Sequence, residues 1–210
     1  EPFILFKYAS KLSRKFNIPW VADYRDAWSQ NSSRRKGLFF KYFISILEKR
    51  YLKNVTFIST VSEYISFNIQ ELVKNKPFVI IPNGYNDNIL TNNIKAKQND
   101  ELLTIALAGT IYNWHPYEIF LNVLSNYLKI NPNRKIRINF YGINEEKEIA
   151  NIVEQFYNLK DSIKIFPKIP NKQLIRELSK SNVLLLFNYY SMMGTKIYDY
   201  LALNRKIILC

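Results

Sequence analysis

Apolar side chains recur along this chain in two kinds of pattern, one typical of helices and one typical of strands. Helical segments repeat apolar residues at i, i+3, i+4 and i+7, which gives each helix one apolar face. This spacing predicts helices over residues 3–16, 38–54, 60–76, 116–130, 145–159, 171–179 and 196–203. Short apolar runs between them predict strands over residues 20–22, 55–59, 78–81, 102–108, 135–141, 162–166, 183–188 and 206–209.

The alternation of strand and helix predicts an α/β fold, because parallel strands need a crossover and the helices supply it. Residues 183–187 are apolar throughout, as is typical of a parallel strand covered on both faces. Residues 85–100 are rich in Asn, Asp and Lys and have little periodicity, so we interpret them as a linker. We therefore predict two Rossmann-like, doubly wound parallel sheets, one in residues 1–84 and one in residues 101–210.

The composition adds packed cores and a strong positive charge to this picture. Of 210 residues, 48% are apolar and 15% aromatic, which excludes a disordered chain. The net charge of +13 favours anionic partners, namely nucleic acid, an anionic membrane or a phosphorylated small molecule. A solvated basic surface explains it equally well, since only Arg34, Arg35 and Lys36 form a tight cluster. The scatter of the other basic residues argues against nucleic acid.

Cysteine and histidine usage limits the chemistry further. Cys210 and His115 are the single residues of their types, so they form neither an internal disulfide nor a zinc site. We predict no metal, no cofactor and a cytoplasmic location, where thiols stay reduced. No apolar run approaches the roughly 20 residues of a membrane-spanning helix.

Ligands of open α/β sheets bind at the carboxyl ends of the strands, which singles out the loops after the predicted strands. After strand 102–108, Gly109 and Thr110 would let a ligand approach the backbone closely. After strand 183–188, the start of the next helix combines free N–H groups with a positive side chain, which favours a phosphate. The residues concerned are Met193, Gly194, Thr195 and Lys196. An ordinary strand–helix turn is the alternative.

Three further groups of polar residues are candidates. Asp199, one turn after Lys196, would accept hydrogen bonds from a ribose diol. His115 would bond a phosphate or a sugar hydroxyl, or would equally cap the following helix. Asp23, Arg25 and Asp26 crowd opposite charges at a predicted strand end. Together with His115 they are the candidate catalytic residues, but for the charged cluster we favour a salt bridge that stabilises its own loop.

Five motifs, in this order, resemble those of bacterial group 1, family 4-like glycosyltransferases. They are IPWVADYRDAW at 18–28, TVS at 60–62, IIPNGY at 80–85, IALAGTIY at 105–112 and TKIYDYLALNRKIIL at 195–209. Neither GxGxxG nor GxxxxGK[ST] occurs in the sequence, which argues against dinucleotide oxidoreductases and P-loop NTPases. The resemblance implies a GT-B fold that is incomplete in both domains. Residues 1–84 would be the back half of the acceptor domain, and residues 101–210 most of the donor domain.

The resemblance also implies a function. Such enzymes transfer a sugar from a nucleotide diphosphate sugar to a glycan or lipid-linked acceptor, in this group with retention, in surface polysaccharide synthesis. By analogy, Gly109 and Thr110 would lie beside the diphosphate, residues 193–196 would hold phosphate oxygens, and Asp199 would bind the ribose. Phe166 and the residues to 169 would line the base. The implied partners are a nucleotide sugar, the acceptor and, through the positive charge, the inner face of an anionic membrane.

The sequence departs from the family pattern at several places. Ser191 stands where related enzymes often carry a Glu that holds the donor sugar, and Trp114 and His115 replace an Arg and a Lys. Two alternatives therefore stay open, a catalytically inactive nucleotide-sugar-binding or scaffold relative and a sugar-nucleotide epimerase. Because the resemblance starts midway through the acceptor domain, we expect no turnover by this chain alone.

Overall fold

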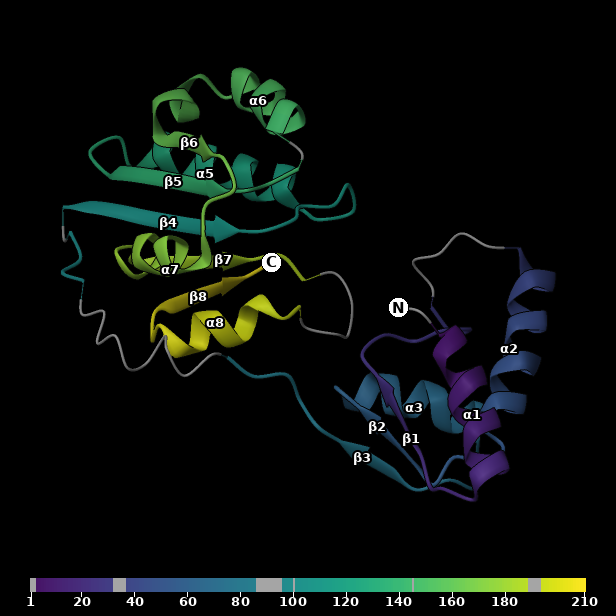
Figure 1. Cartoon of the computed structure of the whole chain (residues 1–210). Helices are drawn as coiled ribbons and strands as arrows, with labels where there is room; N and C mark the ends of the chain where they lie inside the picture. The colour runs from purple at the N-terminus through teal and green to yellow at the C-terminus, as the bar shows by residue number, and fades with distance from the viewer. Residues whose placement is uncertain (1–2, 32–36, 86–95, 100, 145, 189–193) are drawn as a thin grey trace. The chain divides into compact units, whose positions relative to one another are not determined.

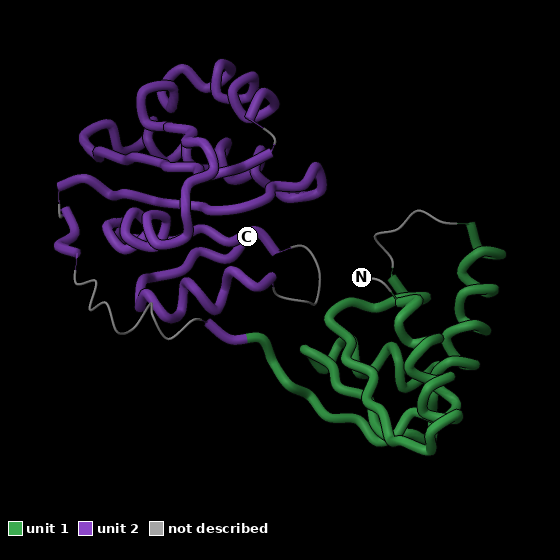
Figure 2. Tube along the Cα trace, in the orientation of Figure 1, with its two compact units in different colours: residues 1–83 green, residues 84–210 purple. Residues whose placement is uncertain are grey.

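The computed structural model describes residues 3–31, 37–85, 96–99, 101–144, 146–188 and 194–210 (Figure 1). The chain divides into two compact units, residues 1–83 and 84–210 (Figure 2). Each unit holds one parallel sheet with its helices, three-stranded in the first and five-stranded in the second. The predicted fold class, α/β with two Rossmann-like parallel sheets, is confirmed.

The first unit is a parallel sheet in the order β1-β2-β3, with a helix in each crossover. Its elements are α1 (Ile4–Phe16), β1 (Val21–Tyr24), α2 (Leu38–Leu52), β2 (Phe57–Thr60), α3 (Glu63–Leu72) and β3 (Phe78–Ile80). Ser62 is the N-cap of α3, since its Oγ accepts a hydrogen bond from the Ile65 N–H at 3.3 Å.

One face of this sheet carries the core of the first unit. Successive side chains of a strand point to opposite faces, and in β1 Ala22 and Tyr24 are buried while Val21 and Asp23 are exposed. The ring of Phe6 in α1 packs 5.0 Å from that of Tyr24. Helix α1 therefore lies over the face to which Tyr24 points.

The second unit is a parallel sheet in the order β6-β5-β4-β7-β8. Its elements are β4 (Leu102–Ala108), α5 (Tyr117–Ile130), β5 (Lys135–Tyr141), α6 (Glu146–Gln155), the 3₁₀ helix η1 (Tyr157–Ser162), β6 (Ile163–Phe166), α7 (Asn171–Ser179), β7 (Val183–Leu186), α8 (Lys196–Ala202) and β8 (Lys206–Leu209). Within this unit the chain first forms the central strand β4, then β5 and β6 on one side of it, and then β7 and β8 on the other side. The winding direction therefore reverses between β4 and β7.

Alternate residues of β4 enter two separate cores, so the second sheet is doubly wound. Ile105 and Leu107 pack with the buried residues of α5 and α6. Ala106 and Ala108 pack with the buried residues of α7 and α8. Figure 1 shows these two pairs of helices on opposite sides of the strands. The central strand is thus covered on both faces, as a parallel strand requires.

The first strand is longer at its carboxyl end than the sequence predicts. We expected it to stop at residue 22 and to be followed by a polar loop. Asp23 instead pairs in register with Ser59 of β2, and the strand continues to Tyr24. The side chain of Asp23 consequently projects from the exposed face of the sheet and not from a loop.

Two helices, α3 and α6, end four residues earlier than predicted, and no helix within the described chain is long and apolar enough to span a membrane. Helix α3 ends at Leu72 and not at residue 76, consistent with the bias against helical conformation before Pro77. Helix α6 ends at Gln155, and the chain continues as η1. Paired hydrogen bonds between Asn158 of η1 and Ser125 of α5 hold this segment against α5.

Candidate functional site

Strands β4 and β7 part at their carboxyl ends. Their last pair in register is Ala106 with Leu184, although β4 continues to Ala108. There the Ala108 N–H donates to the phenol oxygen of Tyr200 in α8, at 3.0 Å. Burial raises the pKa of Tyr200 to about 12, so the phenol stays protonated at neutral pH. A crevice thus opens where the winding reverses, which is where open α/β sheets bind ligands.

A cavity of about 390 Å³ occupies this crevice, within the range of small-molecule sites, about 300–1,000 Å³. Its walls are the ends of β4 and β7, the loops that follow them and the start of α8. Six of the predicted site residues line it: Gly109, Thr110, His115, Gly194, Thr195 and Lys196. The strand order brings these two segments together, although they are far apart in the sequence.

The turn after β4 and the start of α8 meet at Gly109. A methyl group at this position would lie 3.7 Å from Cε of Lys196, so the lysine stem passes over bare backbone. The φ angle of Gly109 is 104°, a conformation that residues with a side chain rarely adopt. The conformation therefore favours glycine here, while a Cβ would make only an ordinary contact with the lysine stem.

The charge at this site comes mainly from Lys196. Its Nζ lies 3.3 Å from Oδ2 of Asp199, whose side chain is 19% exposed. Helix α8 has seven residues, so its dipole adds little to the ammonium charge. A cation beside bare backbone and partly desolvated walls is a suitable environment for an anionic group such as a phosphate.

The remaining predicted donor-binding residues either do not line the cavity or lie outside the described residues. Among the described residues, the cavity lining includes neither Asp199, which pairs with Lys196, nor Phe166. Phe166 ends β6, and its ring stacks on that of Tyr141 at 4.8 Å. Met193 and Ser191 lie outside the described residues.

An aromatic wall, formed by Tyr112, Trp114 and His115, closes one side of the cavity. The rings of Tyr112 and Trp114 stack at 4.5 Å, and the His115 ring stands edge-on to both. The Tyr112 N–H donates to Nδ1 of His115 at 3.3 Å, which leaves Nε2 to carry the imidazole proton. Desolvation lowers the pKa of His115, so this imidazole is a neutral donor at pH 7. The sequence prediction missed Tyr112 and Trp114, although they directly follow the predicted turn.

The charged cluster of the first unit forms a closed hydrogen-bond network. The Asp23 carboxylate accepts from Ser59 Oγ at 2.7 Å and from Arg25 Nε at 3.0 Å. Arg25 Nη1 also donates to Asn83 Oδ1 at 2.7 Å, while Asp26 is exposed. The Ser59 hydrogen bond, followed by the Arg25 contact, holds the pKa of Asp23 below its usual value. The cluster ties together the carboxyl ends of all three strands, which agrees with the structural interpretation.

A buried carboxyl group in the first unit was not predicted. Glu48 of α2 accepts hydrogen bonds from the Tyr24 hydroxyl at 2.7 Å and from the Ser29 N–H at 3.1 Å. Burial raises the pKa of Glu48. Its position gave a signal, because residue 48 lies four residues from both Ile44 and Leu52 on the inward face of the helix.

The described residues contain no cluster of three His, Cys, Asp or Glu side chains that would suit a metal ion. Burial raises the pKa of the Cys210 thiol, which makes it a poor nucleophile. The chemistry of the cavity therefore comes from a lysine, a neutral imidazole, two stacked aromatic rings and exposed backbone.

Comparison with known proteins identifies the fold. Neither a family model nor a curated protein sequence matches the chain. Several solved structures match the chain. Sucrose-phosphate synthase from Thermosynechococcus elongatus matches with a TM-score of 0.71 and 17% identity, over 97% of this chain and 53% of its own. Anabaena Alr3699/HepE, in complex with UDP, matches with 0.70 and 10% identity, over 96% of this chain and 56% of its own.

A third match is WaaG, a glycosyltransferase involved in lipopolysaccharide biosynthesis. Its TM-score is 0.63 at 11% identity, over 97% of this chain and 62% of WaaG. This chain thus spans between 53% and 62% of these three chains. It has the fold of the corresponding part of GT-B glycosyltransferases, as the motifs implied.

Proposed function

We propose that this chain is part of a glycosyltransferase that uses a nucleotide diphosphate sugar as donor. One observation carries the proposal: Gly109 and Lys196 meet at a single cavity in the crevice between β4 and β7. In such a crevice a diphosphate would lie against the bare backbone of Gly109 and beside the ammonium group. The UDP complex of the structurally similar HepE protein supports this choice of ligand.

The cavity residues would act mainly on the leaving group. When the bond between the sugar and the diphosphate breaks, negative charge grows on the phosphate oxygens, and a preplaced cation lowers the energy of that transition state. Lys196 supplies this cation, and the Nε2–H of His115 a further neutral donor. The stacked Tyr112 and Trp114 rings offer a flat apolar surface on which the sugar or acceptor would rest.

The remaining donor contacts follow the family pattern. Asp199 would bind the ribose diol, and Phe166 with the residues after it would line the base. Asp199 already has Lys196 as its partner, so ribose binding would hold the carboxylate next to the phosphate-binding cation. Residues 193–196 would complete the phosphate site.

The finer features of the reaction are proposals of the same kind. We infer a retaining transfer to a glycan or lipid-linked acceptor, in cytoplasmic synthesis of a surface polysaccharide with peripheral contact to an anionic membrane. The first unit would belong to the acceptor domain and the second to the donor domain. The role of the structurally similar WaaG in lipopolysaccharide biosynthesis supports this setting.

Isothermal titration calorimetry with UDP and UDP-glucose tests the donor site. We expect binding to the chain, and we expect Lys196→Ala to weaken it about tenfold or more, since a charged hydrogen bond contributes about 1.5–3 kcal/mol. Lys129→Ala is the matched control, because Lys129 is an exposed lysine on α5 of the same unit. Its affinity should stay unchanged.

A thermal-shift series checks the same point. A ligand at a hundredfold excess over its Kd should stabilise the fold by about 2.7 kcal/mol, and Lys196→Ala should lose this gain at equal concentration. If no nucleoside diphosphate or nucleotide sugar binds the wild-type chain in either assay, the proposal fails.

A further inference from the structure

The chain segments on the two sides of the cavity form hydrogen bonds that point away from it. After β4, the Gly109 N–H donates to the carbonyl oxygen of Tyr141, the last residue of β5, at 3.0 Å. After β7, the Asn188 N–H donates to the carbonyl oxygen of Cys210, which follows β8, at 2.6 Å. In the strand order, β5 and β8 lie on the outer sides of β4 and β7. Both borders of the crevice are therefore tied to their outer neighbours, and the space between them is left to a ligand.

On the β4 side, one side chain extends this outward bonding beyond the strand. Oδ1 of Asn144, in the loop after β5, accepts a hydrogen bond from the Ile111 N–H at 2.8 Å. Ile111 is 0% exposed, so its N–H cannot reach water and needs a protein acceptor. Asn144 is absent from the described lining of the cavity, so its link to the site runs through Ile111.

Ile111 stands in the middle of the loop that forms one wall of the cavity. Thr110 before it and Tyr112 after it both line the cavity, as do Trp114 and His115. The side chain of Ile111 instead packs in the core that the sheet forms with α5 and α6. Its side chain and its N–H therefore anchor the loop, while the residues on both sides of it face a ligand.

The loop that carries Asn144 is itself held in place. Ile143, the residue before it, is 5% exposed and belongs to the same core cluster as Ile111. Two buried isoleucines on neighbouring loops therefore keep the Asn144 amide and the N–H that it binds next to each other. Asn144 is exposed, so a shorter side chain at this position would open no cavity in the core.

Beyond Ile111 the cavity loop closes on itself. The His115 N–H donates to the carbonyl oxygen of Tyr112 at 2.9 Å, and the Tyr112 N–H donates to Nδ1 of His115 at 3.3 Å. Residues 112–115 consequently form one compact turn. A shift at Ile111 would move this turn as a unit, and with it the imidazole and the stacked rings.

We propose that Asn144 is a positioning residue of the nucleotide site, which holds the loop after β4 in the arrangement that binds the diphosphate. The proposal rests on the donor function proposed above and assigns a role to a residue that does not itself line the cavity. A ligand that binds to a preformed loop avoids the entropy cost of ordering that loop in the complex. Without the Asn144 amide the loop gains freedom, and the need to order it opposes binding.

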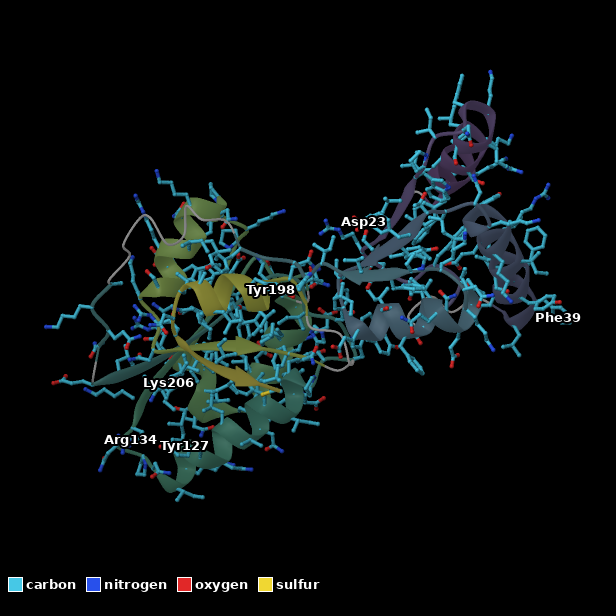
Figure 3. The ribbon with its side chains drawn as sticks, turned by 90° about the horizontal axis from the view of Figure 1, so that it is seen from below. Asp23, Phe39, Tyr127, Arg134, Tyr198 and Lys206 are labelled. Carbon is cyan, nitrogen blue, oxygen red and sulfur yellow. The ribbon has the colours of Figure 1, made fainter. Side chains whose placement is uncertain are left out.

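Calorimetric titration with UDP compares two asparagines of the second unit. Asn144→Ala should weaken UDP binding about fivefold or more, the effect of losing one hydrogen bond that orders the loop in advance. Asn182→Ala is the matched control, because Oδ1 of Asn182 accepts a hydrogen bond from the Thr104 N–H of β4, also at 2.8 Å. Asn182 directly precedes β7 at the amino edge of the sheet, the edge at which Figure 3 shows Arg134 and Lys206. Its substitution should leave UDP affinity within about twofold.

Two further measurements distinguish positioning from a general loss of stability. Asn144→Asp keeps an acceptor oxygen at the same place, so its UDP affinity should stay within about threefold of wild type in about 0.15 M salt, which screens the added charge. Hydrogen exchange without ligand should become at least about fivefold faster over residues 109–115 in Asn144→Ala. The same segment should exchange in Asn182→Ala as it does in the wild-type chain.

The outcomes separate the positioning role from the donor function. If the wild-type chain binds UDP and Asn144→Ala binds it equally well, Asn144 does not position the site, while the donor function stands. Equal losses of affinity in Asn144→Ala and Asn182→Ala would lead to the same conclusion, because general destabilisation would then account for both. A loss that Asn144→Asp does not restore would contradict the role of the acceptor oxygen. If the wild-type chain binds no nucleoside diphosphate, the donor function and the positioning role are both wrong.

Discussion

The carboxyl edges of the two sheets differ in what they offer to a ligand. In the second sheet the strand order reverses between β4 and β7, the strands part, and Gly109 and Lys196 face a cavity of about 390 Å³. In the first sheet the three described strands succeed one another without reversal. There Ser59 and Arg25 both bond to Asp23, and Arg25 also bonds to Asn83, three residues after β3. A reversal of winding opens space for a ligand, whereas an uninterrupted edge lets its polar side chains satisfy each other.

The largest effect should come from a side chain at Gly109. Gly109→Val would force a branched residue into a φ of 104° and would fill the surface beside Lys196. We expect nucleotide affinity to fall at least about a hundredfold, roughly 2.7 kcal/mol, and stability to fall by about 1–3 kcal/mol. Calorimetry with UDP and urea unfolding measure the two losses.

Gly142→Ala is the control that separates strain from blocked binding. Gly142 also has a positive φ, of 60°, and a methyl group there would lie 3.2 Å from Cα of Lys168, away from the cavity. It should destabilise the protein comparably but leave UDP affinity within about twofold. Equal losses of affinity in the two variants would show that strain alone weakens binding, and the cavity would no longer account for the difference between the two edges.

A smaller effect should come from the phenol that occupies the split between β4 and β7. Tyr200→Phe removes the acceptor of the buried Ala108 N–H. An unpaired buried donor costs about 1–3 kcal/mol, which urea unfolding would measure. Tyr157→Phe, at an exposed ring, should change stability by less than about 0.5 kcal/mol. Equal stability of the two variants would mean that this hydrogen bond does not hold the crevice.

Much of the fold was predictable because the buried face of each helix or strand makes apolar residues recur at a regular spacing in the sequence. Every predicted helix and strand occurs in the structure, with shifts at their ends. The shifts come from interactions that periodicity does not contain. One is the pairing of Asp23 with Ser59 across two strands, and another is the bonding of Asn158 to α5.

The candidate site was predictable only in part. The sequence placed Gly109 directly after one predicted strand and Lys196 at the start of the helix that follows another, but their meeting depends on β7 lying beside β4, which is a property of strand order. The same tertiary information decides that Phe166 stacks on Tyr141 and that Glu48 meets the Tyr24 hydroxyl. An isolated acidic residue on an apolar helix face has no periodicity of its own, so its partner Tyr24 could be found only in three dimensions.

The smallest effect should come from the closed network of the first sheet. Arg25→Ala removes the hydrogen bonds to Asp23 and Asn83. The two charged side chains are 56% and 52% exposed, so solvent screens their attraction and the loss of stability should be about 0.2–1 kcal/mol. UDP affinity should not change.

Stability measured as a function of pH separates the contribution of the Asp23–Arg25 ion pair from other effects of the Arg25→Ala substitution. The pKa of Asp23 is held below its ordinary value of 3.8, first by Ser59 and then by Arg25. Its ionised form therefore stabilises the fold above that value, and the stabilisation is lost as the pH falls through the lowered pKa. Urea unfolding should show a difference between wild type and Arg25→Ala that is full at pH near 7 and shrinks in acid. If Arg25→Ala instead weakens UDP binding tenfold at constant stability, the edge of the first sheet also serves a ligand, and the contrast between the two edges is wrong.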